Sequence, residues 1–125
     1  MGGGEGGGSA ERSWLAPVAR QAGMRGVRPT MLPGNLALAR AAVLRAAPGG
    51  PPADVFWQRY TGDAGEMVLI QAPRESAAWL SSVPLPAGWI RLVGERHGAA
   101  VLLASPSADE AALRKVLETL ALLPE

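Results

Sequence analysis

The sequence contains no cysteine and only one histidine, His97, among its 125 residues. The chain therefore forms no disulfide and offers no thiolate ligand to a metal ion. A lone histidine is also too few for a typical zinc site, and no serine stands in the strand-turn-helix context of a nucleophile elbow. We expect no metal, no cofactor and no catalytic residue, so that the protein is not an enzyme.

Long apolar runs are absent as well. The longest, Ala99–Ala104, has six residues, whereas a membrane-spanning helix needs about 20. The first residues, Met1–Ser9, are rich in glycine and lack the apolar centre of a signal peptide. We expect a soluble chain without a transmembrane segment, and an anchor upstream in a longer native protein stays an open alternative.

Positive and negative charges nearly balance, since the net charge is +1. This balance argues against a dedicated nucleic-acid-binding surface. The basic residues are nevertheless unevenly distributed, because residues 1–53 contain six arginines and two glutamates. Arg20, Arg25 and Arg28 in this half are a candidate patch for an acidic lipid or partner. The competing and commoner interpretation is that such arginines are simply solvated.

The amino-acid composition of the chain is typical of a globular protein. Apolar residues make up 48% of the chain, and this length suffices for one domain with its own core. Residues 1–12 are expected to form a flexible glycine-rich linker or tag. Residues 13–125 are expected to form a single α+β domain.

A short helix is predicted at the start of this domain. Ser13 is a suitable N-cap for a helix over residues 14–22, and Gly23 is suited to end it. Trp14 and Val18 share one face of this helix, through which we expect it to dock weakly on the body of the domain.

Strand-forming residues are concentrated in two pairs of segments. β-branched, aromatic and aliphatic residues fill Asp54–Thr61, Glu66–Ala72, Trp89–Val93 and Ala99–Leu103. Short turns that contain glycine join the segments of each pair, so we expect two antiparallel hairpins. His97 lies at the tip of the second hairpin, where we expect it to be exposed and not catalytic.

Two other segments are less clearly marked. The alanines and leucines of Leu36–Ala47 favour a helix by propensity, whereas the alternation of its residues is compatible with a strand. The connection Pro73–Gly88 contains three prolines and is expected to hold one helical turn around Glu75–Leu80.

The C-terminal helix has strong signals. Ser107 is a suitable N-cap, and Glu110 three residues later completes a capping box. Apolar residues then recur at helical spacing, which predicts a stripe that is buried against the sheet. The stripe consists of Leu113, Val116, Leu117 and Leu120. The expected architecture is an antiparallel sheet with this amphipathic helix packed on one face, plus the short N-terminal helix.

Aromatic residues are few, six in all, and four of them are candidates for contact with a ligand or partner. Trp57 and Tyr60 lie on one strand and point to opposite faces, so one of them should face outward. Trp79 is either a lid over the core or an exposed anchor, and Trp89 opens the last hairpin. Burial is the competing interpretation, because large aromatic side chains are mostly buried.

The order of these elements resembles a known family. Pro29–Gly34 followed by Leu36–Ala47 is similar to its P-x-x-L-P-x-G motif and first long strand. Tyr60 at the end of an apolar strand, followed by Met67–Gln71, is similar to its next hairpin. Gly88–Leu103 resembles the strand, glycine and strand of the family's terminal signature. The helix that follows in that signature is similar to the one here with Glu110, Leu113, Val116 and Leu120. The family is a domain of unknown function at the extracytoplasmic C-terminus of membrane-anchored anti-sigma factors and sporulation-related proteins.

This family is distantly akin to lipoprotein carriers and envelope-stress sensors. The resemblance implies a strand for Leu36–Ala47 and a non-enzymatic extracytoplasmic sensing or interaction domain, the regulatory module of an anti-sigma-factor-like protein. A protein partner or envelope-derived ligand would bind the open sheet face or a sheet edge. The alternative is a small carrier that holds an apolar ligand, such as a lipid, between sheet and helix. The residues alone leave the compartment open, the cytoplasm included.

Overall fold

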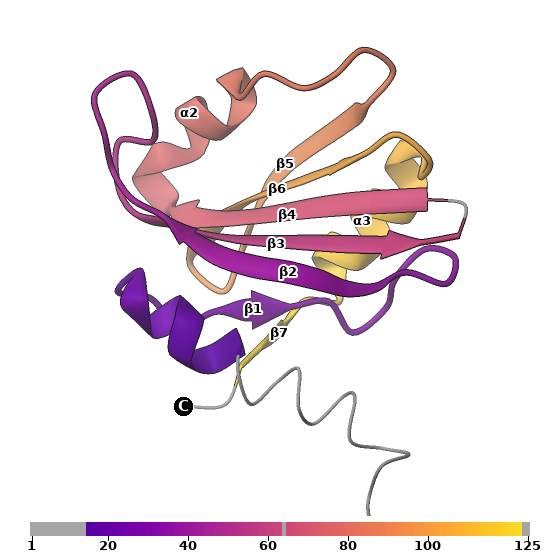
Figure 1. Cartoon of the computed structure of the whole chain (residues 1–125), viewed down its shortest axis with the longest axis horizontal. Coiled ribbons are helices and arrows are strands. Elements are labelled where there is room, and N and C mark those ends of the chain that lie inside the picture. The colour runs from indigo at the N-terminus through magenta and orange to yellow at the C-terminus, as the bar shows by residue number, and fades with distance from the viewer. Residues whose placement is uncertain (1–14, 64, 124–125) are drawn as a thin grey trace, which may run out of the picture.

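The computed structural model describes residues 15–63 and 65–123. At its centre is a five-stranded antiparallel sheet in the order β2-β3-β4-β6-β5 (Figure 1). The strands are β2 (Ala37–Leu44), β3 (Val55–Gly62), β4 (Gly65–Pro73), β5 (Ile90–Arg96) and β6 (Ala99–Ser105). Both predicted hairpins, β3–β4 and β5–β6, are confirmed, and with them the α+β class.

Helices and a small second sheet complete the fold. A helix over residues 15–21 comes first. The others are the 3-10 turn η1 (Arg74–Ser76), α2 (Ala77–Ser82) and α3 (Glu110–Glu118), and the second sheet pairs β1 (Val27–Arg28) with β7 (Ala121–Leu122). The helical turn expected in the connection after β4 is therefore present as η1 and α2. The predicted linker over residues 1–12, the Ser13 cap and Trp14 lie outside the described residues.

The ambiguous segment after residue 35 is a strand, as the family resemblance implied and against its helical propensity. β2 pairs with β3 from end to end, with one bulge between Leu38 and Arg40. Leu38 and Ala41 pack against a cluster that contains Phe56 of β3 and the N-terminal helix. Pairing and packing in the sheet therefore override the intrinsic preference of the alanines and leucines.

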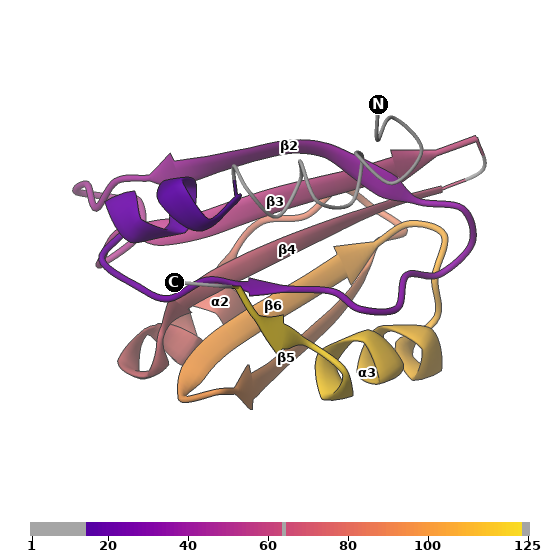
Figure 2. The ribbon, with the colours of Figure 1, turned by 90° about the horizontal axis from the view of Figure 1, so that it is seen from below.

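The helix α3 covers one face of the sheet, against β5 and β6 (Figure 2). Leu113 and Val116 of the helix and Leu120 beyond its end are buried in a cluster with sheet residues such as Leu103, and Leu117 packs on it half-buried. Each fully buried side chain of this kind contributes about 1.5–3 kcal/mol. The predicted apolar stripe is confirmed as the contact that holds the helix on the sheet.

The start of α3 differs from the prediction. Asp109, not Ser107, is the N-cap, and its carboxylate accepts a hydrogen bond of 2.9 Å from the N–H of Ala112. The hydroxyl of Ser107 instead accepts from the backbone N–H of Glu66 at 3.2 Å. A serine and an aspartate two residues apart are both good caps, and the sheet contact of the serine decides between them.

The strand β1 lies across the same face of the sheet and not at its edge (Figure 2). Gln58 and Gln71, both buried, project from the sheet to meet it. The side-chain amide of Gln58 donates a hydrogen bond of 2.7 Å to the backbone carbonyl of Val27. The side-chain oxygen of Gln71 accepts a hydrogen bond of 2.9 Å from the Val27 N–H. Tyr60 donates in turn to the Gln58 side-chain oxygen. We call Gln58 and Gln71 the glutamine clamp.

The N-terminal helix docks more firmly than expected. Leu15, Ala16 and Ala19 are buried against Phe56 and Leu123, whereas Val18 is half-buried. The next segment approaches so closely that a Cβ on Gly26 would lie 2.6 Å from that of Ala19. The predicted weak contact was wrong because the buried face begins at Leu15. None of the helices in the described part of the chain is long and apolar enough to cross a membrane.

Candidate interaction surface

The four aromatic candidates separate onto the two faces of the sheet. Tyr60 points toward α3, is only 4% exposed and belongs to the core cluster around Leu103 and Leu113. Trp57, three residues earlier, packs on the cluster of the opposite face. The predicted opposite orientation of this pair is therefore confirmed, and Tyr60 has the buried role that was the competing interpretation.

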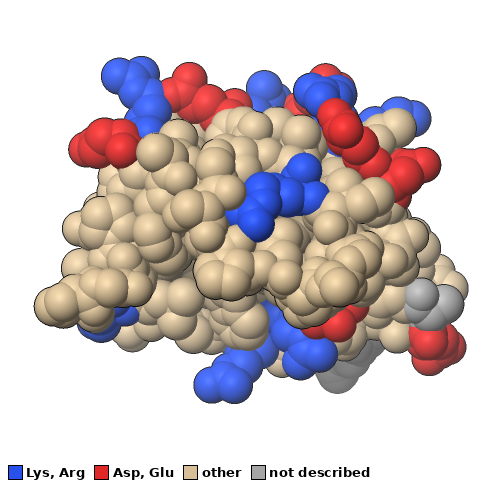
Figure 3. Space-filling view, turned by 90° about the horizontal axis from the view of Figure 1, so that it is seen from above, with Lys and Arg blue, Asp and Glu red and all other residues tan. Residues whose placement is uncertain are grey.

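The three described tryptophans lie on the face that carries α2. Trp57, Trp79 and Trp89 are half-buried and pack against a cluster that includes Ile70 and Leu102. Trp79, on α2, covers this cluster in the manner of the expected lid. Figure 3 views this face of the molecule and shows a broad, mostly uncharged surface, with a basic group near its middle and most other charged side chains at its margins.

The cover on this face is incomplete. The helix α2 packs on β4, β5 and β6, and in Figure 1 it rises above one end of the sheet. In the register of the sheet, Trp57 of β3 lies opposite Ala42 of β2, and Val55 lies opposite Leu44. Residues directly opposite share a face, so Ala42 and Leu44 extend the tryptophan face to the margin of the sheet.

That margin is the strand β2. It ends the strand order of the five-stranded sheet, so its outer N–H and C=O groups face away from β3 without a neighbouring strand in the described part of the chain. Leu44 is 39% exposed, an unusual position for a large apolar residue of this structure. We call the outer edge of β2 together with Arg40, Ala42, Leu44 and Trp57 the β2 edge surface.

One charged side chain, Arg40, lies on β2. It stands opposite Arg59 of β3, whose Nε donates 2.9 Å to the carboxylate of Glu66. Arg40 is exposed, and no acidic side chain among the described residues lies within ion-pair distance of it. The β2 edge surface is therefore apolar with one positive charge that no acidic side chain of the described residues compensates.

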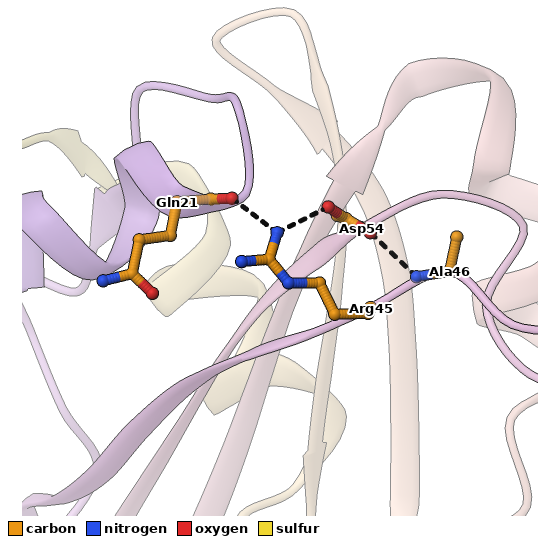
Figure 4. Close-up of polar contacts among 4 residues, drawn as sticks. All are labelled: Gln21, Arg45, Ala46 and Asp54. Atoms are coloured by element: carbon orange, nitrogen blue, oxygen red, sulfur yellow. Dashed lines mark hydrogen bonds and ion pairs between the residues drawn. The ribbon is translucent and has the colours of Figure 1, made fainter.

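The end of β2 is fastened by a polar junction (Figure 4). The Asp54 carboxylate accepts two hydrogen bonds of 2.8 Å, one from the Ala46 N–H and one from the Arg45 guanidinium. Arg45 also donates a hydrogen bond of 2.8 Å to the backbone carbonyl of Gln21. The N–H of Ala46, and next the Arg45 guanidinium, hold the pKa of the Asp54 carboxyl below its ordinary value. The junction joins the N-terminal helix, the end of β2 and the start of β3.

The other sequence candidates do not gather into a site. Arg20 and Arg25 line a cavity of about 420 Å³ beside the N-terminal helix, and Arg25 donates 3.0 Å to the carbonyl of Leu123. Arg28 belongs to β1 and donates 3.3 Å to the carbonyl of Pro29. In the described ranges, no three His, Asp or Glu side chains are grouped as metal ligands would be.

His97 occupies the turn between β5 and β6, as predicted. It has a positive φ of 54° and is followed by Gly98 at 78°, the left-handed pair that a two-residue hairpin turn requires. The side chain is exposed, but its Nε2 lies 2.8 Å from the carbonyl oxygen of Leu120. Since a carbonyl only accepts, Nε2 carries the proton. The histidine thus ties the hairpin to the segment after α3.

Sequence reasoning missed Arg40, Ala42 and Leu44. Their signal was the alternation within β2, where residues at every second position share a face and only one charge interrupts the apolar set. That β2 would be an edge strand depends on the strand order, which no local pattern of the sequence indicates.

Comparison with known proteins gives a structural likeness. No family model matches the sequence, and no curated protein is significantly similar to it. A chain in the complex structure of Pseudomonas aeruginosa MucA/MucB is similar to this protein with a TM-score of 0.53 and 14% identity, over 79% of this chain and 35% of that chain. This chain thus spans about a third of the length of the one it matches, and the likeness is one of fold.

Proposed function

We propose that the protein is a non-enzymatic, extracytoplasmic protein-interaction domain, the regulatory module of an anti-sigma-factor-like protein. The observation that carries this proposal is the β2 edge surface. It combines strand backbone that no other strand of the described residues pairs with, a partly exposed tryptophan and an exposed leucine. Such a surface is suited to binding another polypeptide, since main-chain hydrogen bonds and apolar contacts are then available together.

Two further observations support a regulatory interaction domain. The likeness to a chain from a complex of two proteins is in keeping with a fold that serves protein assembly. The order of motifs from Pro29 to Leu120 resembles domains found in membrane-anchored anti-sigma factors outside the cytoplasm. The extracytoplasmic setting rests on that resemblance.

The alternative, a carrier of an apolar ligand between sheet and helix, has less support. Met67, Leu69, Leu103 and Leu113 fill that space and are fully buried. The cavity of about 420 Å³ lies instead beside the N-terminal helix. Native mass spectrometry after mild purification separates the two functions, because a carrier retains a bound lipid mass and an interaction domain does not.

The proposed function is tested by site-specific photocrosslinking in cells of the organism that encodes the protein. A photoreactive amino acid replaces Leu44 on the β2 edge surface, and in a control it replaces Lys115, which is exposed on α3. We expect a discrete crosslink to one polypeptide from position 44 and none from position 115. Equal crosslinking from both positions, or none from position 44, would contradict the proposal.

A further inference from the structure

We infer that the β2 edge surface takes an extended partner segment as a sixth strand, and that this segment places an acidic side chain opposite Arg40. The inference rests on the proposed function and specifies the chemistry of the partner. It is argued from the regular part of β2, from the charges on that strand and from the contrast with the other edge of the sheet.

The regular part of β2 runs from Arg40 to Leu44. These five residues pair one to one with Arg59 to Val55 of β3, after the bulge at Leu38 and Arg40. A straight segment of this length presents about 17 Å of strand edge, at about 3.4 Å per residue. An added strand would pair with this segment, since a bulge interrupts regular pairing.

The charges select an acidic partner. Arg40 lies beside Arg59 in the register, and Glu66 already binds Arg59 at 2.9 Å. Like charges directly opposite each other destabilise a strand pair, and opposite charges stabilise it. A carboxylate opposite Arg40 on an added outer strand would offset the repulsion between Arg40 and Arg59.

A second copy of the chain that paired through its own β2 would not supply that carboxylate. The residues of β2, ALARAAVL, include no aspartate or glutamate. Pairing of β2 with its own copy would therefore place Arg40 against an apolar residue or another arginine. The partner segment accordingly differs in sequence from β2 and contains an acidic residue.

The other edge of the sheet is less suited to this role. β5 contains Arg91, Glu95 and Arg96 among seven residues. Arg91 donates 2.7 Å to the carbonyl of Leu80, and Glu95 pairs with Arg74 at 3.4 Å. Charges of both signs discourage the addition of a strand, so we assign the partner segment to β2.

The test uses the full chain and labelled nonapeptides in a fluorescence polarisation assay. The probe STVTETVTS alternates in the manner of a strand and has a central glutamate, and its control STVTKTVTS has a central lysine. We expect the glutamate peptide to bind about fivefold to tenfold more tightly, from cross-strand charge pairing. A third peptide, STVPEPVTS, lacks two backbone N–H groups beside the glutamate and should bind much more weakly.

Reversing the charge of single residues of the protein tests whether the preference for the glutamate peptide arises at Arg40. Arg40→Glu should invert the order of the glutamate and lysine peptides, and Lys115→Glu, with the same change in net charge, should preserve it. Circular dichroism and the thermal midpoint check that both variants are folded. Peptide-induced changes in the amide resonances of Arg40 to Leu44 are expected for the wild-type chain.

The remaining outcomes overturn the inference in distinct ways. Binding at β2 without a charge preference removes the acidic partner but leaves the proposed function. Equal binding of the proline peptide removes the added strand. A concentration-dependent dimer that is lost in a Leu44→Asp variant would make a second copy the occupant. Absence of binding by every peptide also overturns the inference, while the crosslink from position 44 decides the proposed function separately.

Discussion

Arg40 and Arg91 stand at opposite ends of one row of residues that crosses all five strands of the sheet. Arg91, on β5, donates to the backbone carbonyls of Leu80 and Val83 and so holds the end of α2 over the sheet. Arg40, on β2, has no such contact among the described residues. The same residue type thus supports the fold at one edge and is exposed at the other.

The two halves of the sheet differ in the same way. The β5 half has α3 on one face and α2 on the other. The β2 half has the N-terminal helix and β1 on one face, and on its second face Trp57, Ala42 and Leu44 lie beyond α2. Stability should therefore depend on the β5 half and binding on the β2 half.

The largest effect expected is the loss of core packing under the β5 half. Leu113→Ala should lower the free energy of unfolding by about 2–5 kcal/mol, because it leaves a cavity between α3 and the sheet. Leu44→Ala, the matched change on the β2 edge surface, should cost less than about 1 kcal/mol. Urea unfolding followed by circular dichroism measures both, and similar losses would contradict the comparison.

The next effect concerns the two arginines directly. Arg91→Met retains the aliphatic stem but removes the hydrogen bonds to Leu80 and Val83, so a loss of about 1 kcal/mol is expected. Arg40→Met should change the free energy of unfolding by no more than about 0.5 kcal/mol. Chemical denaturation again gives the values. A larger loss for Arg40→Met would show that Arg40 has a structural role after all.

A smaller effect is expected at the junction that ends β2. Because the pKa of Asp54 is lowered in the folded state, its contribution is complete above the ordinary carboxyl range, about pH 4. It is lost as the pH falls through the lowered pKa. The protection of the Ala46 amide, measured as its exchange rate relative to the intrinsic rate at the same pH, should fall over that acidic range. Asp54→Asn, which does not titrate, should abolish this pH dependence of the protection, and an Asp54 carboxyl resonance that titrates at or above the ordinary value would refute the assignment.

The smallest effect is expected at the turn that ends β5. His97→Gln should cost about 0.5 kcal/mol, since one exposed hydrogen bond to Leu120 is weakened. Asparagine adopts the positive φ of this position more readily than glutamine does. His97→Asn therefore separates the loss of the hydrogen bond from the effect of backbone strain. Thermal unfolding of both variants measures the difference. A loss of several kcal/mol from His97→Gln would mean that the turn, not α2, secures this edge.

Local patterns of the sequence were sufficient for some elements and insufficient for others. The β3–β4 and β5–β6 hairpins and the α3 stripe follow from residue type and spacing alone. The identity of the α3 cap does not, because Ser107 and Asp109 are equally suitable until the Glu66 contact takes the serine. Propensity also favoured a helix for β2, whose strand form depends on the pairing with β3.

The candidate surface was less predictable than the fold. Trp57, Trp79 and Trp89 could be named as candidates because large aromatic residues are visible in the sequence itself and are few in this chain. Arg40 and Leu44 could not, because their significance depends on which strands are at the edges. The glutamine clamp was equally out of reach, since two glutamines within strands indicate only polar positions until a backbone is found against them.

The pairing of β1 with β7, beside the glutamine clamp, also constrains the order in which the fold can be completed. Val27, which the clamp holds, pairs with Leu122 near the opposite end of the sequence, and the intervening sheet supplies both glutamines. Such a contact joins distant parts of the chain and forms only after the loop between them is closed. During synthesis, β1 can therefore pair with β7 only after Ala121 and Leu122 have emerged. A nascent chain that stops short of Ala121 would contain the whole five-stranded sheet and still lack Leu123, which covers Phe56 and Leu15.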